Sequence, residues 1–325
     1  MSGEFDIIAR HFAPLATDPG AFALTDDAAL VGPYVVTKDL LVEGVHFLAK
    51  DPRDLVARKA LRVNLSDLAA KGAKPLGYFL GCVWPAAAKE REIADFARGL
   101  ADDQAAFKVS LLGGDTTAHK EKGAPFTISV TMFGAAPGAG LLRRDGAKVG
   151  DDIYVTGAIG DAGLGLRALK GEIKPPAAAK KLFAERYRLP SPRLAIGGAL
   201  PGLASASIDV SDGLLADAGH IAERSGVAME VSAARIPLSA PAAQWLGVQG
   251  DHARAIADLA SCGDDYEILF TAAPARRRSI EMAAQVTKTA VARIGVVTRG
   301  QGVKLLAEAG EPIETPRRGF DHFRE

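Results

Sequence analysis

The stretch VNLSDLAA, residues 63–70, places a single carboxylate, that of Asp67, among leucines and alanines. We predict that it lies in a helix, because apolar residues around it recur at helical spacing and stop at Gly72. The helix is expected to open at Asp51 and Pro52, where Asp51 suits the capping position and Pro52 the first helical position. Burying a carboxylate among apolar side chains without a partner is costly. The stretch therefore indicates a helix that carries a functional aspartate.

Further helices and strands are expected on both sides of this helix. A segment rich in glycine, alanine and proline, residues 134–150, is interpreted as a domain junction. We therefore predict an α/β (α+β) fold with two domains, residues 1–138 and 139–325. In the first domain we expect strands at residues 34–38, 77–83, 109–112 and 126–133, and helices at residues 4–12 and 90–107. In the second we expect strands at residues 152–156, 207–210, 267–270 and 292–297, and a helix at residues 213–225.

The composition is that of a folded globular protein. The 325 residues are 48% hydrophobic and 24% charged, and 39 basic residues balance 39 acidic ones. Because there is no basic excess, we expect no nucleic-acid or membrane partner. Cys82 and Cys262 form no C-x-x-C pair, which argues against a disulfide framework or a zinc site. Residues 1–12 do not resemble a signal peptide, so we expect a cytoplasmic protein.

Aspartates recur at the ends of the expected elements, where sites in α/β folds usually form. If several converge, their mutual repulsion raises their pKa values unless cations lie between them. Carboxylate oxygens suit Mg²⁺, whose coordination a phosphate often completes, so convergence would imply Mg²⁺ and a nucleotide. Structural roles stay open, because Asp26 or Asp27 suits a turn and Asp209 or Asp212 a helix cap. The aspartates in question are Asp27, Asp39, Asp67, Asp115, Asp209 and Asp212.

Several longer motifs occur together in one family. GVHF at residues 44–47 and GFDHF at residues 319–323 point to a single branch of it. The other motifs are DDAAL (26–30), NLSDLAA (64–70), GGDTT (113–117), YVTG (154–157), LPSPR (189–193), DVSDGL (209–214) and GDDYE (263–267). On these motifs the chain resembles the thiamine-monophosphate kinase family, in the superfamily of aminoimidazole ribonucleotide synthetase and selenophosphate synthetase.

The resemblance implies a fold and an activity. The fold would be that of aminoimidazole ribonucleotide synthetase, with an N-terminal mixed-sheet domain that pairs in a homodimer and a C-terminal α/β domain. The activity would be transfer of the γ-phosphoryl group of ATP to thiamine monophosphate, giving thiamine diphosphate and ADP. Several Mg²⁺ ions would serve as cofactors, and ATP as co-substrate.

The resemblance also implies a set of site residues. Lys38 would either replace a metal charge or take part through its backbone carbonyl alone. From the residues alone, Arg144 could also be a solvated arginine beside Arg143, and Phe320 is equally compatible with packing at the C-terminus. The implied metal-site residues are Asp27, Thr37, Lys38, Asp39, Asp67, Asp115, Asp209 and Asp212. The implied ATP contacts are Gly114, Asp115, Arg144 and Ser211, and the implied thiamine-phosphate contacts are His46, Asp264 and Phe320.

The expected chemistry requires no catalytic general base. A phosphate monoester has its second pKa near ~6 and is largely dianionic at neutral pH. The enzyme must instead align two polyanions, which is a task for metal ions and positioning. A P-loop motif and the protein-kinase signatures are absent, so the aspartates would have to supply the site.

The chain departs from the family pattern at four positions. Thr25 stands where glycine is usual, Lys38 follows Thr37 where the family has S-T-D, Asp264 replaces glutamate, and Phe320 stands where tyrosine or tryptophan also occurs. Two alternatives therefore stay open. One is another ATP-dependent enzyme of the superfamily, and the other is a nucleotide-binding protein with little turnover. Selenophosphate synthetase fits poorly, because no cysteine precedes Cys82.

Overall fold

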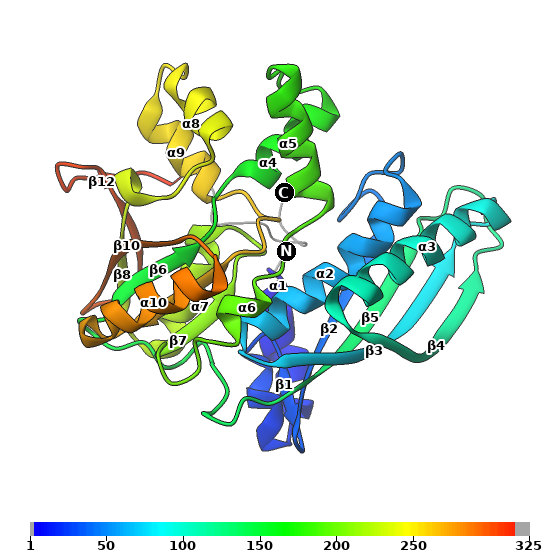
Figure 1. Cartoon of the computed structure of the whole chain (residues 1–325), viewed down its shortest axis with the longest axis horizontal. Coiled ribbons are helices and arrows are strands. Elements are labelled where there is room, and N and C mark those ends of the chain that lie inside the picture. Colours follow the sequence, from blue (N-terminus) through cyan, green and yellow to red (C-terminus); the bar gives the residue numbers. More distant parts are fainter. Residues whose placement is uncertain (1–2, 316–325) are drawn as a thin grey trace.

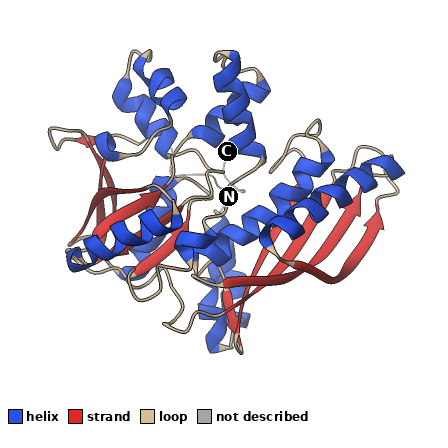
Figure 2. Cartoon of the chain, viewed as in Figure 1, coloured by secondary structure: helices blue, strands red, loops and turns tan. Residues whose placement is uncertain are grey.

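The computed structural model describes residues 3–315 and consists of two sheets with helices packed against them (Figures 1 and 2). The long helix α2 (Arg53–Ala70) lies between the two sheets and contacts strands of both (Figure 1). The expected two-domain α/β fold is thus confirmed. Within the described range, no helix combines the length and the apolar character needed to cross a membrane. Phe320 and the GFDHF motif lie outside the described residues.

Five strands form the N-terminal sheet in the order β1-β2-β5-β3-β4, antiparallel except for the pair β3–β4. Helices α2 and α3 cover one face (Figure 1). Because that face is covered, burial alternates along β2: Val35 and Leu41 are buried, whereas Tyr34 and Leu40 are exposed on the outer face. The bounds are β1 (Ala29–Val31), β2 (Tyr34–Val42), β3 (Lys74–Trp84), β4 (Ser110–Ala118), β5 (Thr127–Ala135) and α3 (Glu90–Phe107). Short helical segments precede the sheet: α1 (Glu4–Ile7), Ile8–Phe12, Ala13–Leu15 and Pro19–Leu24.

Seven strands form the C-terminal sheet in the order β12-β11-β8-β10-β6-β9-β7, antiparallel except for the pair β8–β11. Its central strands β6 and β9 are buried throughout. The strands are β6 (Asp152–Thr156), β7 (Ala206–Asp209), β8 (Ala228–Ser232), β9 (Ile268–Ala272), β10 (Val291–Thr298), β11 (Gly302–Leu306) and β12 (Pro312–Ile313). The helices are α4 (Asp161–Lys170), α5 (Ala177–Arg188), α6 (Leu194–Gly197), α7 (Leu214–Ser225), α8 (Ala240–Gly247), α9 (His252–Ala260) and α10 (Arg277–Thr287), with 3₁₀ turns at Ala233–Arg235 and Pro274–Arg276.

Most of the predicted elements are present, and α3 and β6 begin and end where expected. Two local predictions are wrong. Asp51 does not cap α2, which has no side-chain cap; its carboxylate instead binds Arg188, 2.7 Å away on α5. β4 does not end before Asp115 but continues to Ala118, because it pairs with β3 over this length. Strands β1, β8, β11 and β12 and helices α5, α6, α8 and α9 were not predicted.

Helix α2 is buried between the two domains, which explains its unusual composition. Leu61, Leu65 and Leu68 are 0% exposed, and the helix packs on β2 and β5 of one sheet and on β7 and α6 beside the other. It ends at Ala70, and Gly72 just beyond it has a φ of +69°, a left-handed conformation that glycine adopts without strain. Every polar side chain on α2 therefore needs a partner, and the domain junction is where such partners are found.

Candidate active site

Four aspartates from different elements approach one another at the junction of the domains. Asp27 precedes β1, Asp39 lies on β2, Asp67 lies on α2, and Asp209 ends β7. One carboxylate oxygen from each of Asp27, Asp67 and Asp209 lies within 4.8 Å of the other two. Residues separated by up to 182 positions in the chain (209 − 27) thus form one acidic cluster. We call these four residues the aspartate cluster.

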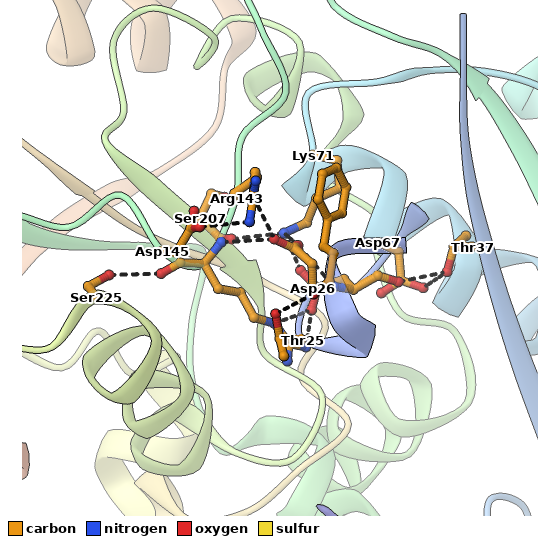
Figure 3. A network of polar contacts seen from close by, with 12 residues as sticks. Thr25, Asp26, Thr37, Asp67, Lys71, Arg143, Asp145, Ser207 and Ser225 are labelled. Atoms are coloured by element: carbon orange, nitrogen blue, oxygen red, sulfur yellow. Dashed lines mark hydrogen bonds and ion pairs between the residues drawn. The ribbon is translucent and has the colours of Figure 1, made fainter. Parts of the chain in front are cut away.

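Strand β2 presents Thr37 and Asp39 to the aspartate cluster, because alternate residues of a strand face the same side. The Thr37 hydroxyl donates to the Asp67 carboxylate, as Figure 3 shows, and lies 3.3 Å from the backbone carbonyl oxygen of Asp27. Lys38 is exposed on the opposite face of the sheet, where its ammonium donates to Ser129. The Lys38 side chain therefore does not contact the cluster.

Two cations bind Asp27. The ammonium of Lys71 lies 2.5 Å from Asp27 Oδ2 and 2.5 Å from Asp26 Oδ1 (Figure 3). Nε of Arg144 donates to Asp27 Oδ1 at 2.9 Å, and its Nη2 binds the same oxygen. Burial alone would raise the pKa of Asp27, but the charges of Arg144 and Lys71 outweigh it and lower that pKa. Asp27 is therefore ionised at neutral pH.

In the other three aspartates of the cluster, burial and neighbouring carboxylates outweigh the groups that lower the pKa. Burial, reinforced by the charge of Asp27, raises the pKa of Asp39 to about 6 and that of Asp209 to about 8. Burial and the charges of Asp39 and Asp209 raise the pKa of Asp67 well above its ordinary value. Among residues 3–315, no hydrogen-bond partner reaches the buried Oδ2 of Asp39. A dense set of carboxylate oxygens whose burial and mutual repulsion raise three of their pKa values fits Mg²⁺, which prefers such hard ligands.

A second polar group lies at the start of α7. Ligand atoms of Asp212, Asp217 and His220 lie within 4.8 Å of one another. Asp217, which was not predicted as a site residue, accepts the backbone N–H groups of Asp212 at 3.2 Å and Gly213 at 3.1 Å. Burial lowers the pKa of His220 to about 4, so this imidazole is neutral at pH 7. The alternative that Asp209 or Asp212 caps α7 is wrong, because the cap position is Gly213.

Lys59 on α2 links the two predicted acceptor-binding residues that the structure describes. Its ammonium lies 3.0 Å from Asp264 Oδ1, donates to the carbonyl oxygen of His46 at 2.9 Å, and lies 4.0 Å from the ring centroid of Tyr187. The backbone N–H of Asp264 donates to the carbonyl oxygen of Ser211 at 2.8 Å, which places this loop against the β7–α7 turn. Lys59 is only 2% exposed. It therefore connects the residues predicted for the acceptor with those predicted for ATP.

Sequence reasoning missed Lys59 and Lys71, although a signal for both was present. Each is a charged residue within or next to the apolar stretch that singled out Asp67. Both are buried, at 2% and 0% exposure, in the same helix or at its C-terminal end. A buried lysine is rare unless its charge is paired, so the pattern that marked Asp67 also marks these two residues.

Comparison with known proteins identifies the family. The AIR synthase related protein N-terminal domain matches residues 25–136, and the C-terminal domain of the same group matches residues 148–308. The thiamine-monophosphate kinase of Caulobacter vibrioides is 44% identical to this chain, over 98% of the chain and 90% of the relative. The chain belongs to the thiamine-monophosphate kinase family. The Escherichia coli member is 35% identical, over 99% of this chain and 98% of its own.

A solved structure of the thiamine-monophosphate kinase family has the same fold over nearly the whole chain. The structure of AaThiL complexed with AMPPCP and TMP matches with a TM-score of 0.85 and 29% identity, covering 99% of this chain and 97% of that one. The aspartate cluster of this chain therefore lies within a fold in which a relative has been seen with both ligands. Its membership of the family makes this protein a kinase.

Two residues assigned by resemblance to the thiamine-monophosphate kinase family lie apart from the aspartate cluster in this chain. Asp115 pairs with Gly81 in the β3–β4 ladder and lines a shallow depression on the outer sheet face beside Ser129. That face is opposite to the one that carries Asp39 and that α2, with Asp67, covers. Gly114 precedes it, and a Cβ there would lie 1.8 Å from the carbonyl oxygen of Leu80. The close pairing of β3 and β4 therefore accounts for the glycine at this position.

Proposed function

We propose that the protein transfers the γ-phosphoryl group of ATP to thiamine monophosphate, giving thiamine diphosphate and ADP. The observation that carries this proposal is the convergence of Asp27, Asp39, Asp67 and Asp209 at the domain junction. Family membership supports the identity of the reaction, and the cluster supplies the chemistry that this reaction needs. Because the phosphoryl donor is ATP, we place this activity in the cytoplasm.

Magnesium ions fit the residues of this site. When bound, they neutralise phosphate charge and stabilise the transferring group. Arg144, beside Asp27, supplies a guanidinium suited to binding a phosphate through two parallel hydrogen bonds. Ser211 lies at the β7–α7 turn and serves the nucleotide, as does Gly114. The proposed metal ligands at the domain junction are Asp27, Thr37, Asp39, Asp67, Asp209 and Asp212, and Lys38 is retained only for its backbone carbonyl. Asp115 stays a predicted ligand, but it lies on the opposite sheet face of the same subunit and cannot bind a metal ion at this cluster from there.

The acceptor would bind where Lys59 joins two loops. His46 and Asp264 would contact thiamine monophosphate, and Lys59 holds both of these residues. Thiamine carries a cationic ring, which a carboxylate such as Asp264 suits, whereas its phosphate would face the metal ions. The acceptor phosphate is already ionised at neutral pH, so positioning rather than proton removal is the task of these residues. Phe320 stays a predicted ring contact.

We propose that the protein acts as a homodimer that pairs through the outer face of the N-terminal sheet. Tyr34, Leu40 and Phe79 are 45%, 54% and 44% exposed on this face, and such clustered apolar surface is typical of an interface. Lys38 and Asp115 lie on the same face. A partner subunit would therefore cover Asp115, which the described chain leaves exposed.

One incubation tests the proposed reaction. Purified protein is supplied with ATP, Mg²⁺ and thiamine monophosphate, and thiamine diphosphate is measured; free thiamine and an EDTA sample serve as controls. We expect product from the monophosphate alone, and none with EDTA. If no product forms although ATP binds in a Mg²⁺-dependent way, the acceptor assignment is wrong, and another acceptor must be sought. If ATP binding is also absent, the site itself is misassigned.

A further inference from the structure

Lys71 is a fully buried lysine whose ammonium lies among three oxygen atoms. It is 0% exposed and lies 2.5 Å from Asp26 Oδ1, 2.5 Å from Asp27 Oδ2 and 3.1 Å from the carbonyl oxygen of Ser207. Figure 3 shows its side chain pointing from the end of α2 to Asp26. The ammonium donates to Asp26 Oδ1 and to the Ser207 carbonyl oxygen, and it forms an ion pair with Asp27 Oδ2. The Lys71 ammonium therefore occupies a buried pocket of oxygen atoms that binds a positive charge.

This cation site is continuous with the aspartate cluster. The backbone N–H of Lys71 donates to the carbonyl oxygen of Asp67 at 3.0 Å, so the two residues are one helical turn apart and share a face of α2. Ser207 lies on β7, two residues before Asp209. The Lys71 ammonium thus lies next to the carboxylates that we propose as metal ligands.

The two oxygens of Asp27 are divided between two cations. Oδ1 is bound by Arg144, whereas Oδ2 contacts Lys71 and has no hydrogen-bond donor beyond that ion pair within the described chain. Asp26 turns its Oδ2 to the backbone N–H of Arg144 at 3.2 Å and its Oδ1 to Lys71. Without Lys71, Oδ1 of Asp26 and Oδ2 of Asp27 would be buried with no cation of the described chain beside them.

We infer that Lys71 is a built-in counter-ion of the magnesium site: it holds Asp26 and Asp27 in place and supplies a fixed positive charge that a metal ion would otherwise have to supply. This inference rests on the proposed function, since it needs Mg²⁺ at the aspartate cluster. A lysine is suited to this role because its compact charge is fixed by a covalent tether. Because of this fixed charge, the folded protein depends less on bound Mg²⁺ to offset the repulsion among its aspartates.

Thermal unfolding with and without Mg²⁺ separates this role from a merely structural one. We expect Lys71→Met to lower Tm in EDTA by at least about 5 °C relative to the unchanged protein, because breaking a buried ion pair is strongly destabilising. Saturating Mg²⁺ should close most of that gap, since the metal replaces the missing charge. A lysine that only joined α2 to β7 would leave the same gap in EDTA and in Mg²⁺, and this result would overturn the inference.

Matched variants keep the test decisive. Lys74→Met removes an exposed lysine three residues away and should leave both Tm values unchanged. If Lys71→Met does not fold in EDTA, the double variant Asp26→Asn/Lys71→Met, which also removes one negative charge, should restore folding. Failure of the double variant to fold would contradict a counter-ion role. If Mg²⁺ does not raise the Tm of the unchanged protein, the proposed metal site is wrong, and this inference is wrong with it. If Mg²⁺ raises the Tm of the unchanged protein but the Tm difference between it and Lys71→Met persists, only the role of Lys71 is refuted.

Discussion

Lys38 and Lys59 show that the tertiary contacts of a lysine, rather than its neighbours in sequence, determine its role. Lys38 lies next to two proposed metal ligands in sequence, yet its ammonium is exposed on the outer sheet face and binds Ser129. Lys59 is not adjacent to any assigned residue in sequence, yet it is buried and binds both Asp264 and the carbonyl of His46. Sequence proximity to the proposed ligands would therefore suggest a role in the site for Lys38, whereas the observed contacts indicate such a role for Lys59.

We expect Lys59→Met to raise the KM for thiamine monophosphate by on the order of 10- to 100-fold, because a charge-assisted hydrogen bond contributes about 1.5–3 kcal/mol. The KM for ATP should change far less, since Lys59 reaches the nucleotide side only through the backbone of Asp264. Steady-state kinetics with each substrate varied in turn provides the measurement. Equal effects on both KM values would show a general loss of structure.

Lys38→Thr is the matched lysine control and a prediction in its own right. Because the Lys38 side chain faces away from the aspartate cluster, we expect kcat within about threefold of the unchanged protein; surface substitutions usually have small effects. The same assay measures it. A complete loss of turnover would show that the Lys38 side chain has a role that its contacts do not reveal.

At the scale of elements, the conformation of the β7–α7 turn depends on Asp217, which follows the turn in sequence. Gly213 has φ +119°, and a Cβ there would lie 2.8 Å from backbone atoms of Ser261. Asp217, in the first turn of α7, accepts the N–H groups of Asp212 and Gly213 and so fixes this turn. Burial, followed by the charge of Asp212, raises the pKa of Asp217 well above its ordinary value. Asp217 is therefore a positioning residue for Asp212.

Substitution of Asp217 tests this role. An asparagine keeps an oxygen acceptor, so Asp217→Asn should retain the KM for ATP within about threefold, whereas Asp217→Ala leaves two buried N–H groups unpaired at about 1–3 kcal/mol each. We expect the alanine variant to show a lower Tm and a raised KM for ATP. If Asp217→Asn instead loses Mg²⁺ affinity in a metal titration, Asp217 is itself a metal ligand.

At the scale of the whole molecule, the proposed dimer has a direct test. Leu40→Lys places a charge on the exposed outer face of β2, and we expect it to convert dimer into monomer, because a buried unpaired charge is costly at an interface. Light scattering coupled to size-exclusion chromatography gives the mass. Val286→Lys, on α10 and 81% exposed, is the matched control and should leave the mass unchanged. A dimer that persists in Leu40→Lys would move the interface elsewhere.

The metal-free protein should lose stability as pH rises. The folded-state pKa values of Asp39 and Asp209 are raised to about 6 and about 8, so between pH ~4 and ~8 the folded state holds protons that the unfolded state has released. Raising pH through this window favours unfolding, and above pH ~8 the effect levels off. In EDTA we expect Asp209→Asn to have a higher Tm than the unchanged protein at pH 8 and a clearly smaller advantage at pH 5, because most of the window lies above pH 5. Equal Tm values at both pH values would contradict this assignment.

The sequence by itself determined the family, the kinds of elements and the special status of Asp67. It could do so because these depend on local patterns: helical spacing around residues 63–70, strand alternation in β2, and motifs that carry the resemblance. Alternation even predicts that Thr37 and Asp39 share a face that Lys38 does not. Element ends were less predictable where pairing sets them, as in β4.

Only the tertiary structure decided which side chains meet. Lys71 binds Asp26, 45 positions away, and the carbonyl of Ser207, 136 positions away, and nothing in its local pattern names these partners. The packing of α2 between two sheets brings them together, because burying its apolar sides on both domains also buries the charges that it carries. Local spacing sets the direction of a side chain from its own element; long-range packing sets what lies opposite it.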